Sequence, residues 1–287
     1  MPAFSLMQTR YFDCGPYRLR LDRPLVMAII NTTPDSFSGD GVAGSVALAV
    51  ERAKAAIDAG ADILDVGGES TRPGSAAVAL DEELRRVIPV VEALAPLGLP
   101  ISIDTVKPEV MVASLAAGAS LVNDINALRA PGALEAVVAS NCGVCVMHMQ
   151  GEPRTMQDAP AYGDVVADVE AFLVERRDTL IGAGVSPTRI LLDPGFGFGK
   201  SLAHNIELFG ALERLAKSGP LLVGVCRKRM IGEITGCSLG ERDLPSVVAA
   251  IAAVARGAAV LRVHDAAALR AGLKIWEALA PGALKFE

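Results

Sequence analysis

The sequence is poor in aromatic residues, has no net positive charge and contains no long hydrophobic run. Phe, Trp and Tyr make up 4% of its 287 residues, so an aromatic side chain beside a motif is informative. The formal net charge is −6, which argues against a nucleic-acid-binding surface. No stretch reaches the roughly 18 consecutive apolar residues of a membrane span. We therefore expect neither a nucleic-acid nor a membrane partner.

Cysteine is scarce and irregularly spaced. Five cysteines without the spacing of a disulfide framework indicate a reducing compartment. Met1–Ser5 shows no basic segment followed by an apolar one, so we expect no secretion signal and a cytoplasmic location. Cys142 and Cys145 form a CxxC motif that has no second pair for zinc and lies at the start of a predicted strand. These two cysteines are expected to be small buried residues, and a redox function is the remote alternative.

Several catalytic motifs are also missing. The chain contains no recognisable Ser-His-Asp arrangement, HExxH or P-loop. Asn31–Pro34, which follows the first predicted strand, does not read G-x-G-x-x-G. This argues against an open, doubly wound sheet, which is the main alternative architecture.

The positive signal is a repeated strand-then-helix unit. Hydrophobic residues make up 51% of the chain, so a large core is available. Apolar runs alternate with helical patterns, and a helix–glycine–strand sequence recurs at Gly60, Gly118, Gly184 and Gly257. The predicted strands are Leu25–Ile30, Asp62–Val66, Ile101–Ile103, Leu121–Val122, Gly143–Met147, Ile190–Leu192, Leu221–Val225 and Ala258–Val263. Eight such units are typical of an α/β protein with a (β/α)₈ TIM barrel, which usually has about 250 residues.

The N-terminal residues show a different pattern. Thr9–Asp13 and Tyr17–Leu21 alternate polar and apolar residues around Cys14–Pro16, which predicts a β-hairpin. We expect residues 1–23 to form a hairpin extension that caps one end of the barrel. Residues 24–287 are expected to form a single barrel domain.

Polar or ionisable residues follow every predicted strand. In chain order they are Asn31, Gly67–Arg72, Asp104, Asn123–Asp124, His148, Asp193, Cys226–Arg229, and Arg262 with His264. The carboxyl ends of barrel strands converge on one face, where barrel enzymes carry out their chemistry. The pattern therefore predicts an active site there.

The chemistry of these residues divides into two groups. Asp104, Asn123 and Asp193 offer acceptors and an amide, which suit a flat heterocycle with adjacent N–H donors. The second group is cationic and favours an anionic ligand such as phosphate. Its members are Arg227, Lys228, Arg229, Arg262 and His264. The alternative for Arg227 and Arg262 is that they pair with loop carboxylates.

Asp193 opens a glycine turn that ends at Lys200. Glycines alternate with two phenylalanines in this turn, so the backbone can approach a ligand while aromatic rings wall a flat substrate. Lys200 belongs to the motif, but the sequence assigns it no contact. His148 suits a supporting role behind the site, and His204 is expected to lie at the surface or to cap a helix.

On these residues the chain resembles the dihydropteroate synthase family. Its two longest signatures are Met27–Gly41 (MAIINTTPDSFSGDG) and Asp65–Gly74 (DVGGESTRPG). Shorter matches follow in family order: Ser102–Thr105, Asn123–Ile125, Met147–Gly151, Thr155–Gln157, Asp193–Lys200, Arg227–Lys228, Ile231–Gly232 and Arg262–Asp265. The resemblance spans nearly the whole chain after the hairpin.

The resemblance implies a homodimeric TIM barrel that condenses 6-hydroxymethyl-7,8-dihydropterin diphosphate with 4-aminobenzoate, using Mg²⁺, in folate biosynthesis. Diphosphate departure would leave a cationic pterin methylene for attack by the aminobenzoate nitrogen. Sulfonamides target this family. No protein nucleophile is needed, which agrees with the missing motifs.

The resemblance also implies residue roles. Asp104, Asn123, Asp193 and Lys228 would hold the pterin, and Arg262 would lie near the ring and the diphosphate. Asn31 and His264 would bind the diphosphate, with Asn31 also on Mg²⁺. Loop one contributes Asp35 and Phe37, and loop two contributes Thr71, Arg72 and Pro73. Phe37, Pro73 and Phe198 would wall the aminobenzoate pocket, and Asp35 could favour the developing cation.

Two positions depart from the family pattern, and two other functions compete. Cys226 and Arg229 stand where serines are commoner. Arg229 would either strengthen the aminobenzoate site or point to solvent. A pterin-binding methyltransferase of the same superfold would not need the diphosphate cluster, and a silent pterin-binding paralogue would not need intact loops.

Overall fold

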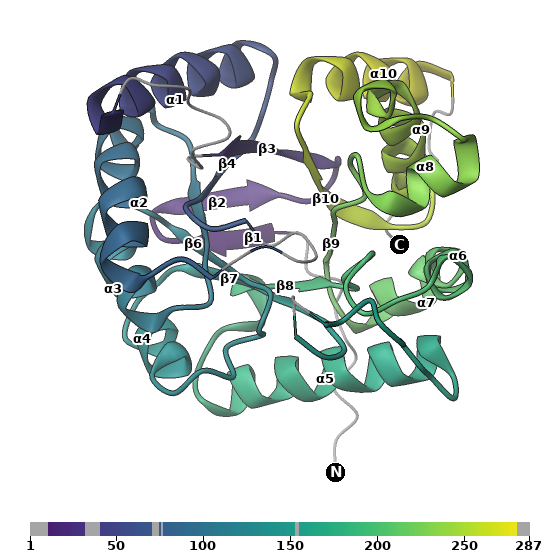
Figure 1. Ribbon diagram of the computed structural model, residues 1–287. Helices are drawn as coiled ribbons and strands as arrows, with labels where there is room; N and C mark the ends of the chain where they lie inside the picture. Colours follow the sequence, from purple (N-terminus) through teal and green to yellow (C-terminus); the bar gives the residue numbers. More distant parts are fainter. Residues whose placement is uncertain (1–10, 32–40, 71–74, 76, 153–154, 280–287) are drawn as a thin grey trace.

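Eight parallel strands close into a barrel in the computed structural model, which describes residues 11–31, 41–70, 75, 77–152 and 155–279. The order of the strands around the barrel follows their order in the chain, and the last strand pairs with the first (Figure 1). The predicted TIM barrel is therefore confirmed. The open-sheet alternative is wrong, because an open sheet would leave two unpaired edges.

The barrel strands are short and buried. They are β3 (Leu25–Asn31), β4 (Ile63–Gly67), β5 (Ile101–Asp104), β6 (Leu121–Asp124), β7 (Gly143–Met147), β8 (Ile190–Asp193), β9 (Leu221–Val223) and β10 (Ala258–Val263). Successive side chains point to opposite faces of a strand. Thus Leu121 packs in the barrel interior, whereas Val122 packs in the layer between strands and helices. Continuous apolar runs satisfy both layers, which is why alternation was absent from the sequence.

The helices surround the barrel (Figure 1). They are α1 (Gly41–Asp58), α2 (Leu80–Leu94), α3 (Pro108–Ala116), α4 (Ala133–Val138), α5 (Val165–Gly182), α6 (Leu202–Gly210), α7 (Leu212–Leu215), α8 (Arg229–Thr235), α9 (Asp243–Val254) and α10 (Ala266–Leu279). The predicted stop at Gly118 is confirmed, since its φ of 115° is a left-handed conformation that glycine tolerates. Within the described part of the chain, none of these helices has the length and apolar character that a membrane crossing needs.

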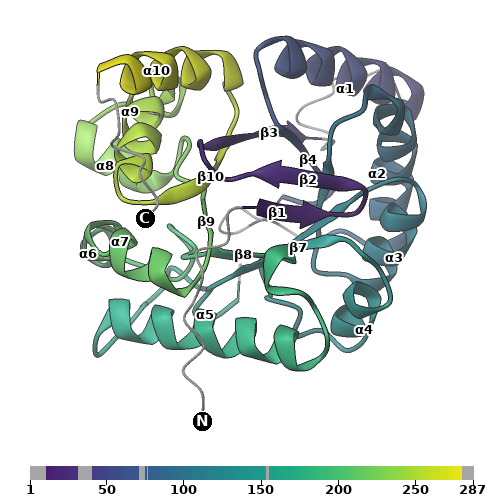
Figure 2. The same ribbon diagram turned by 180° about the vertical axis from the view of Figure 1, so that it is seen from behind.

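The N-terminal hairpin closes one end of the barrel. Its strands are β1 (Tyr11–Cys14) and β2 (Tyr17–Arg20), and they lie across that end in Figure 2. Phe12 is fully buried against the interior side chains, and burial of a phenylalanine contributes roughly 1.5–3 kcal/mol. Gly143 leaves space for it, because a Cβ there would lie 2.6 Å from Phe12 Cζ. The hairpin contacts the start of β7, so the opposite end is left for a site.

Three segments differ from the sequence prediction. The sequence pattern predicts one helix over Ala203–Lys217, but the structure breaks it between α6 and α7, where Gly210 weakens helix propensity. A 3₁₀ turn over Ala216–Ser218 ends the segment. The strand predicted to reach Val225 stops at Val223. Helix α8 was not predicted, because a seven-residue helix is too short to show a clear period.

Candidate active site

The predicted acceptors end three strands on the same face of the barrel. Asp104 is the last residue of β5, Asn123 lies beside it on β6, and Asp193 is the last residue of β8. Each of the three residues is buried, with 6% of its surface exposed. Burial raises the pKa of Asp104 to about 7 and also raises the pKa of Asp193, although Arg262 and Lys228 oppose these shifts.

Arg262 bridges two carboxylates inside the barrel mouth. Its Nε donates to Asp65 Oδ2 at 2.7 Å, and a terminal nitrogen donates to Asp104 Oδ2 at 2.8 Å. Asp65 is fully buried in β4. The sequence reasoning missed Asp65 as a site residue, although a carboxylate within an apolar run was a usable signal. Arg262 thus pairs with carboxylates of strands and not of loops.

The pairing leaves acceptor capacity at Asp104. Its buried Oδ1 has no hydrogen-bond partner among the described residues. An unpaired buried acceptor is costly, so it is usually matched by a ligand, water or another polar group. An N–H donor of a bound heterocycle would satisfy this requirement.

The predicted cationic cluster divides into two directions. Lys228, the N-cap residue of α8, donates to the carbonyl oxygen of Phe196, and its Nζ lies 4.6 Å from the centroid of the Phe198 ring. Burial lowers the pKa of Lys228 to about 8. Arg227 instead pairs with Asp243 at the start of α9, with one bond of 2.8 Å. The alternative for Arg227 is pairing with a loop carboxylate; Arg227 is paired, but its partner Asp243 is the first residue of helix α9.

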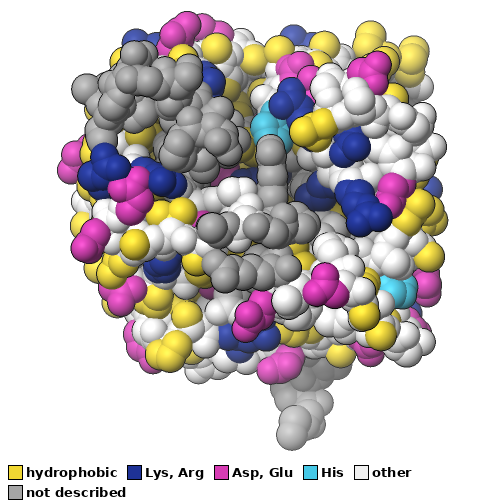
Figure 3. Space-filling view, viewed as in Figure 1, with side chains coloured by type: hydrophobic (Ala, Val, Ile, Leu, Met, Phe, Trp, Pro, Cys, Tyr) yellow, Lys and Arg dark blue, Asp and Glu magenta, His cyan; other side chains and the backbone are white. Residues whose placement is uncertain are grey.

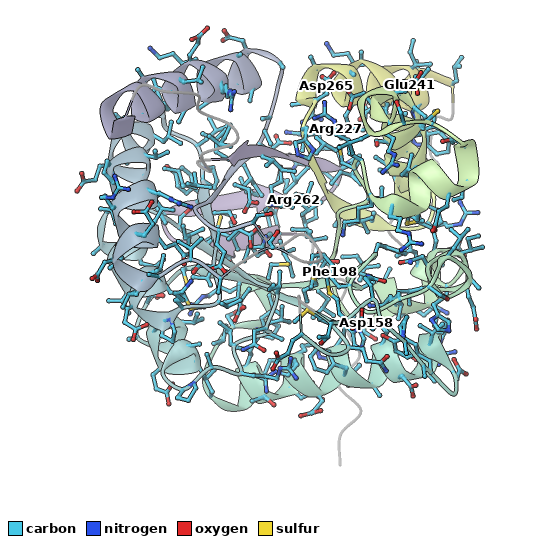
Figure 4. All side chains as sticks on the ribbon, in the orientation of Figure 1. Asp158, Phe198, Arg227, Glu241, Arg262 and Asp265 are labelled. Carbon is cyan, nitrogen blue, oxygen red and sulfur yellow. The ribbon has the colours of Figure 1, made fainter. Side chains whose placement is uncertain are left out.

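Figure 4 shows the same division in space. The Arg262 and Phe198 labels lie near the middle of the barrel, whereas Arg227 lies towards the side that carries α8–α10. Lys and Arg side chains lie on both sides of the molecule's centre in the space-filling view, and several of them are on the side that carries α8–α10 (Figure 3). His264 follows β10, and its Nδ1 lies 3.2 Å from Cys226 Sγ. Cys226 therefore lies within hydrogen-bonding distance of His264, which is predicted to bind the diphosphate.

Two predictions on minor residues are confirmed. Cys142 and Cys145 are buried free cysteines, and burial raises the pKa of the Cys145 thiol well above its usual range. A thiolate, which redox and zinc chemistry require, is therefore disfavoured at Cys145. His204 and Ser201 form a capping box at the start of α6.

Several predicted site residues lie outside the described part of the chain. They are Asp35, Phe37, Thr71, Arg72 and Pro73. Asn31 ends β3 beside Gly67, but its side chain is not described. The roles predicted for these residues stay predictions.

Lowering the pH from 7 to 5 is expected to reduce the free energy of unfolding by about 2 kcal/mol through His148. Burial and the Lys200 ammonium lower the pKa of His148 to about 3 in the folded protein, whereas in the unfolded chain it is about 6.5. The unfolded state binds more protons below pH 6.5, so stability falls as the pH decreases through that value. Denaturant titrations at both pH values measure the loss. It should shrink in His148→Gln, and an equal loss in both proteins would contradict this assignment.

The fold and this site together define a class of protein, the pterin-binding enzymes. A family model described as pterin binding enzyme matches residues 27–264, which is nearly the whole barrel. Dihydropteroate synthase of Escherichia coli (strain K12) is 48% identical over 262 residues, covering 91% of this chain and 93% of that protein.

Solved structures give the same result. Xanthomonas albilineans dihydropteroate synthase with 4-aminobenzoic acid has a TM-score of 0.89 and 50% identity, covering 96% of this chain and 99% of that one. Burkholderia cenocepacia dihydropteroate synthase complexed with 7,8-dihydropteroate has a TM-score of 0.86 and 49% identity, covering 95% and 97%. The chain therefore belongs to the dihydropteroate synthase family, whose members are transferases.

Proposed function

We propose that this chain condenses 6-hydroxymethyl-7,8-dihydropterin diphosphate with 4-aminobenzoate to give 7,8-dihydropteroate and diphosphate. The observation that carries the proposal is the set of buried acceptors on β5, β6 and β8 beside two half-buried cations, Lys228 and Arg262. The relatives from Xanthomonas albilineans and Burkholderia cenocepacia hold one substrate and the product of this reaction.

The pterin would bind across the strand ends through its N–H groups. A pterin presents an exocyclic amino group next to a ring N–H, and a carboxylate can accept both in parallel. Asp193 suits this pair, because Oδ1 already accepts from Gly195 N at 2.7 Å and the group is therefore held in one orientation. Asp104 and Asn123 would hold the other donors, and Lys228 would donate to a ring acceptor.

The diphosphate would lie towards Arg262, His264 and loop two, with Thr71 and Arg72 as further donors. Arginine forks and histidine suit anionic oxygens. Among the described residues no group of three or more His, Cys, Asp or Glu side chains could hold a metal alone. This fits Mg²⁺, which is commonly bound by one or two protein groups together with phosphate oxygens. Asn31 would be its protein ligand, and the bound ion would neutralise charge on the diphosphate.

The reaction needs positioning and electrostatic stabilisation and does not need a protein nucleophile. The bond between the pterin methylene carbon and the diphosphate oxygen breaks, and the electron pair leaves with the oxygen. The aminobenzoate nitrogen then forms the C–N bond and loses a proton. Cations of Arg262, Lys228 and Arg72 stabilise the leaving group, while the Asp35 carboxylate favours the cationic methylene.

The aminobenzoate ring would lie between Phe37, Pro73 and Phe198. Phe198 packs against a small apolar cluster that contains Ile125, Met147, Met149 and Met156. The Lys228 ammonium lies over the Phe198 ring and adds a cation–π contact. Phe198 is thus held by packing and not by its own turn alone.

Arg229→Ser is expected to leave the KM for aminobenzoate unchanged within about twofold. The Arg229 side chain is 79% exposed and pairs with Glu233 one helical turn away, at 2.7 Å. An exposed pair of this kind contributes only about 0.3–0.5 kcal/mol, and it directs the guanidinium away from the pocket. Steady-state kinetics at fixed pterin concentration measure the effect. A KM that rises tenfold would show that Arg229 reaches the substrate.

The homodimer implied by the resemblance would use the outer face of α8–α10. These three helices lie side by side in Figures 1 and 2. Large apolar side chains are exposed there at helical spacing: Leu244 at 73% and Val248 at 60% on α9, and Ile275 at 62% and Leu279 at 80% on α10. Large exposed apolar side chains on neighbouring helices favour an interaction surface there.

Light scattering after size-exclusion chromatography is expected to give twice the chain mass of 29.8 kDa. Charges placed on the apolar face should separate the two copies, because a C₂ interface repeats each charge on both subunits. The test variant is Leu244→Glu with Val248→Glu, and Val112→Glu on α3 is the matched control, since Val112 is 55% exposed on another face. A monomeric wild type would contradict the proposal.

Product analysis tests the proposed reaction. The chain with pterin diphosphate and 4-aminobenzoate is expected to form 7,8-dihydropteroate, detected by chromatography. A methyltransferase of the same superfold would form none and would instead demethylate methyl-tetrahydrofolate.

A further inference from the structure

Lys200 is a buried cation whose nitrogen is surrounded by backbone oxygens. The residue is 2% exposed. Its Nζ donates to Gly195 O at 2.9 Å and to Phe198 O at 3.2 Å, and it lies 3.4 Å from His148 O. It also lies 2.9 Å from His148 Nδ1. An ammonium has three donors and no acceptor, so it suits a point where several carbonyl groups converge.

The turn that Lys200 ties down packs directly on the segment after β7. Gly195, Gly197 and Gly199 all have positive φ, at 69°, 79° and 62°. A Cβ on Gly195 would overlap the carbonyl oxygen of His148, and one on Gly199 would overlap that of Gln150. Lys200 bridges the turn and His148, so it fixes the turn against that segment.

This turn orients three groups of the proposed site. Its Gly195 N–H donates to Asp193 Oδ1 at 2.7 Å, and its Phe196 carbonyl accepts from Lys228 Nζ. It also carries Phe198, whose ring Lys228 contacts. A displacement of the turn would therefore move an acceptor, a cation and an aromatic wall together.

Lys200 also acts on the charge of Asp193. Burial raises the pKa of Asp193, and the cations Lys228, Lys200 and Arg262 oppose that shift together with the Gly195 N–H. The other titratable groups nearby are Cys145, whose pKa is raised well above its usual range, and His148, which stays neutral above about pH 3. Burial lowers the pKa of Lys200 to about 7 and that of Lys228 to about 8, so both are fully charged on the acid side of these values. Lys228, Lys200 and Arg262 are thus the charges that favour an ionised Asp193 in the acid range where it titrates.

We propose that Lys200 is a positioning residue for the pterin: its ammonium holds the 195–199 turn and keeps Asp193 an ionised acceptor for the pterin N–H donors. The proposal rests on the proposed function, because it names the support of that same site. Lys200 itself does not touch the substrate.

The test compares Lys200→Met with Lys217→Met, which makes the same change at an exposed lysine before β9, at the opposite end of the barrel. Calorimetric titration with the pterin diphosphate is carried out from pH 5 to 9, with circular dichroism as the check of folding. Lys200→Met is expected to weaken pterin binding about tenfold at pH 7. Pterin affinity should fall at low pH as Asp193 becomes protonated, and we call this fall the acid limb. In Lys200→Met the acid limb should move upwards by about half a pH unit or more, because loss of a nearby cation raises the pKa of Asp193. Lys217→Met should match the wild type in both respects.

Either of two results would overturn the proposal. One is a folded Lys200→Met that binds pterin within twofold of the wild type. The other is a pterin affinity that falls by the same factor at every pH, with the acid limb where it is in the wild type. A lysine that only supports the local structure would produce that result. If Lys200→Met does not fold, Lys200→Arg retains the charge and should keep the limb in place while binding is weaker, and a shifted limb there would refute the idea. Failure of the proposed function would look different, because wild type and Lys217→Met would then lack product formation.

Discussion

Asp193→Asn is expected to weaken binding of the pterin diphosphate about 100-fold, or by about 3 kcal/mol. Oδ1 of Asp193 accepts the Gly195 N–H at 2.7 Å, so the amide oxygen of asparagine would take that place. The amide nitrogen would then occupy the position of Oδ2 and present its hydrogens to the pterin donors. An attractive charge-assisted pair becomes two donors facing each other, and a buried donor is left without an acceptor.

Calorimetric titration of both proteins with the pterin diphosphate measures this loss. Asp158→Asn is the matched control, because it makes the same substitution at an exposed loop position. We expect it to bind like the wild type. Binding by Asp193→Asn within threefold of the wild type would show that Asp193 does not hold the pterin edge.

Arg262→Met is expected to reduce kcat/KM by about 1000-fold and the free energy of unfolding by about 3–5 kcal/mol. The activity loss follows from removing a preorganised cation beside the leaving group. The stability loss follows because Asp65 and Asp104 lose the guanidinium that both of them bind, and an uncompensated buried charge is costly.

The sign of the pH effect separates these two losses. Without Arg262 the folded-state pKa of Asp104 rises further above its unfolded value, so the unfolded state releases a proton that the folded state retains. The variant should therefore lose less stability at pH 5 than at pH 8. Adding Asp65→Asn should restore part of the stability but not the activity. Equal instability at both pH values, or full activity in the single variant, would contradict the bridge described for Arg262.

The barrel could be predicted from the sequence because its signals are local and repeated. Apolar runs such as Leu25–Ile30 satisfy two buried layers at once, and residues such as Gly118 end helices through a backbone conformation that few other residues adopt. The acceptors Asp104, Asn123 and Asp193 could be predicted too. Each directly follows or ends an apolar run, and closure of the barrel then brings the strand ends together.

The directions of the cationic side chains could not be predicted. Arg227 and Lys228 are neighbours in sequence, but Arg227 adopts a φ of 55° and pairs outward with Asp243 while Lys228 reaches the turn after β8. That difference depends on a non-glycine residue in a left-handed conformation, which composition does not signal. Asp65 was missed for a related reason. Its partner Arg262 is 197 residues away, and only the closed barrel makes them neighbours.

The most direct test of the account measures diphosphate and 7,8-dihydropteroate in one reaction mixture. We predict equal amounts of the two products, dependent on 4-aminobenzoate and lost together in Arg262→Met. A wild-type protein that binds the pterin diphosphate but releases no diphosphate when 4-aminobenzoate is present would contradict it, and would identify a catalytically silent pterin-binding paralogue.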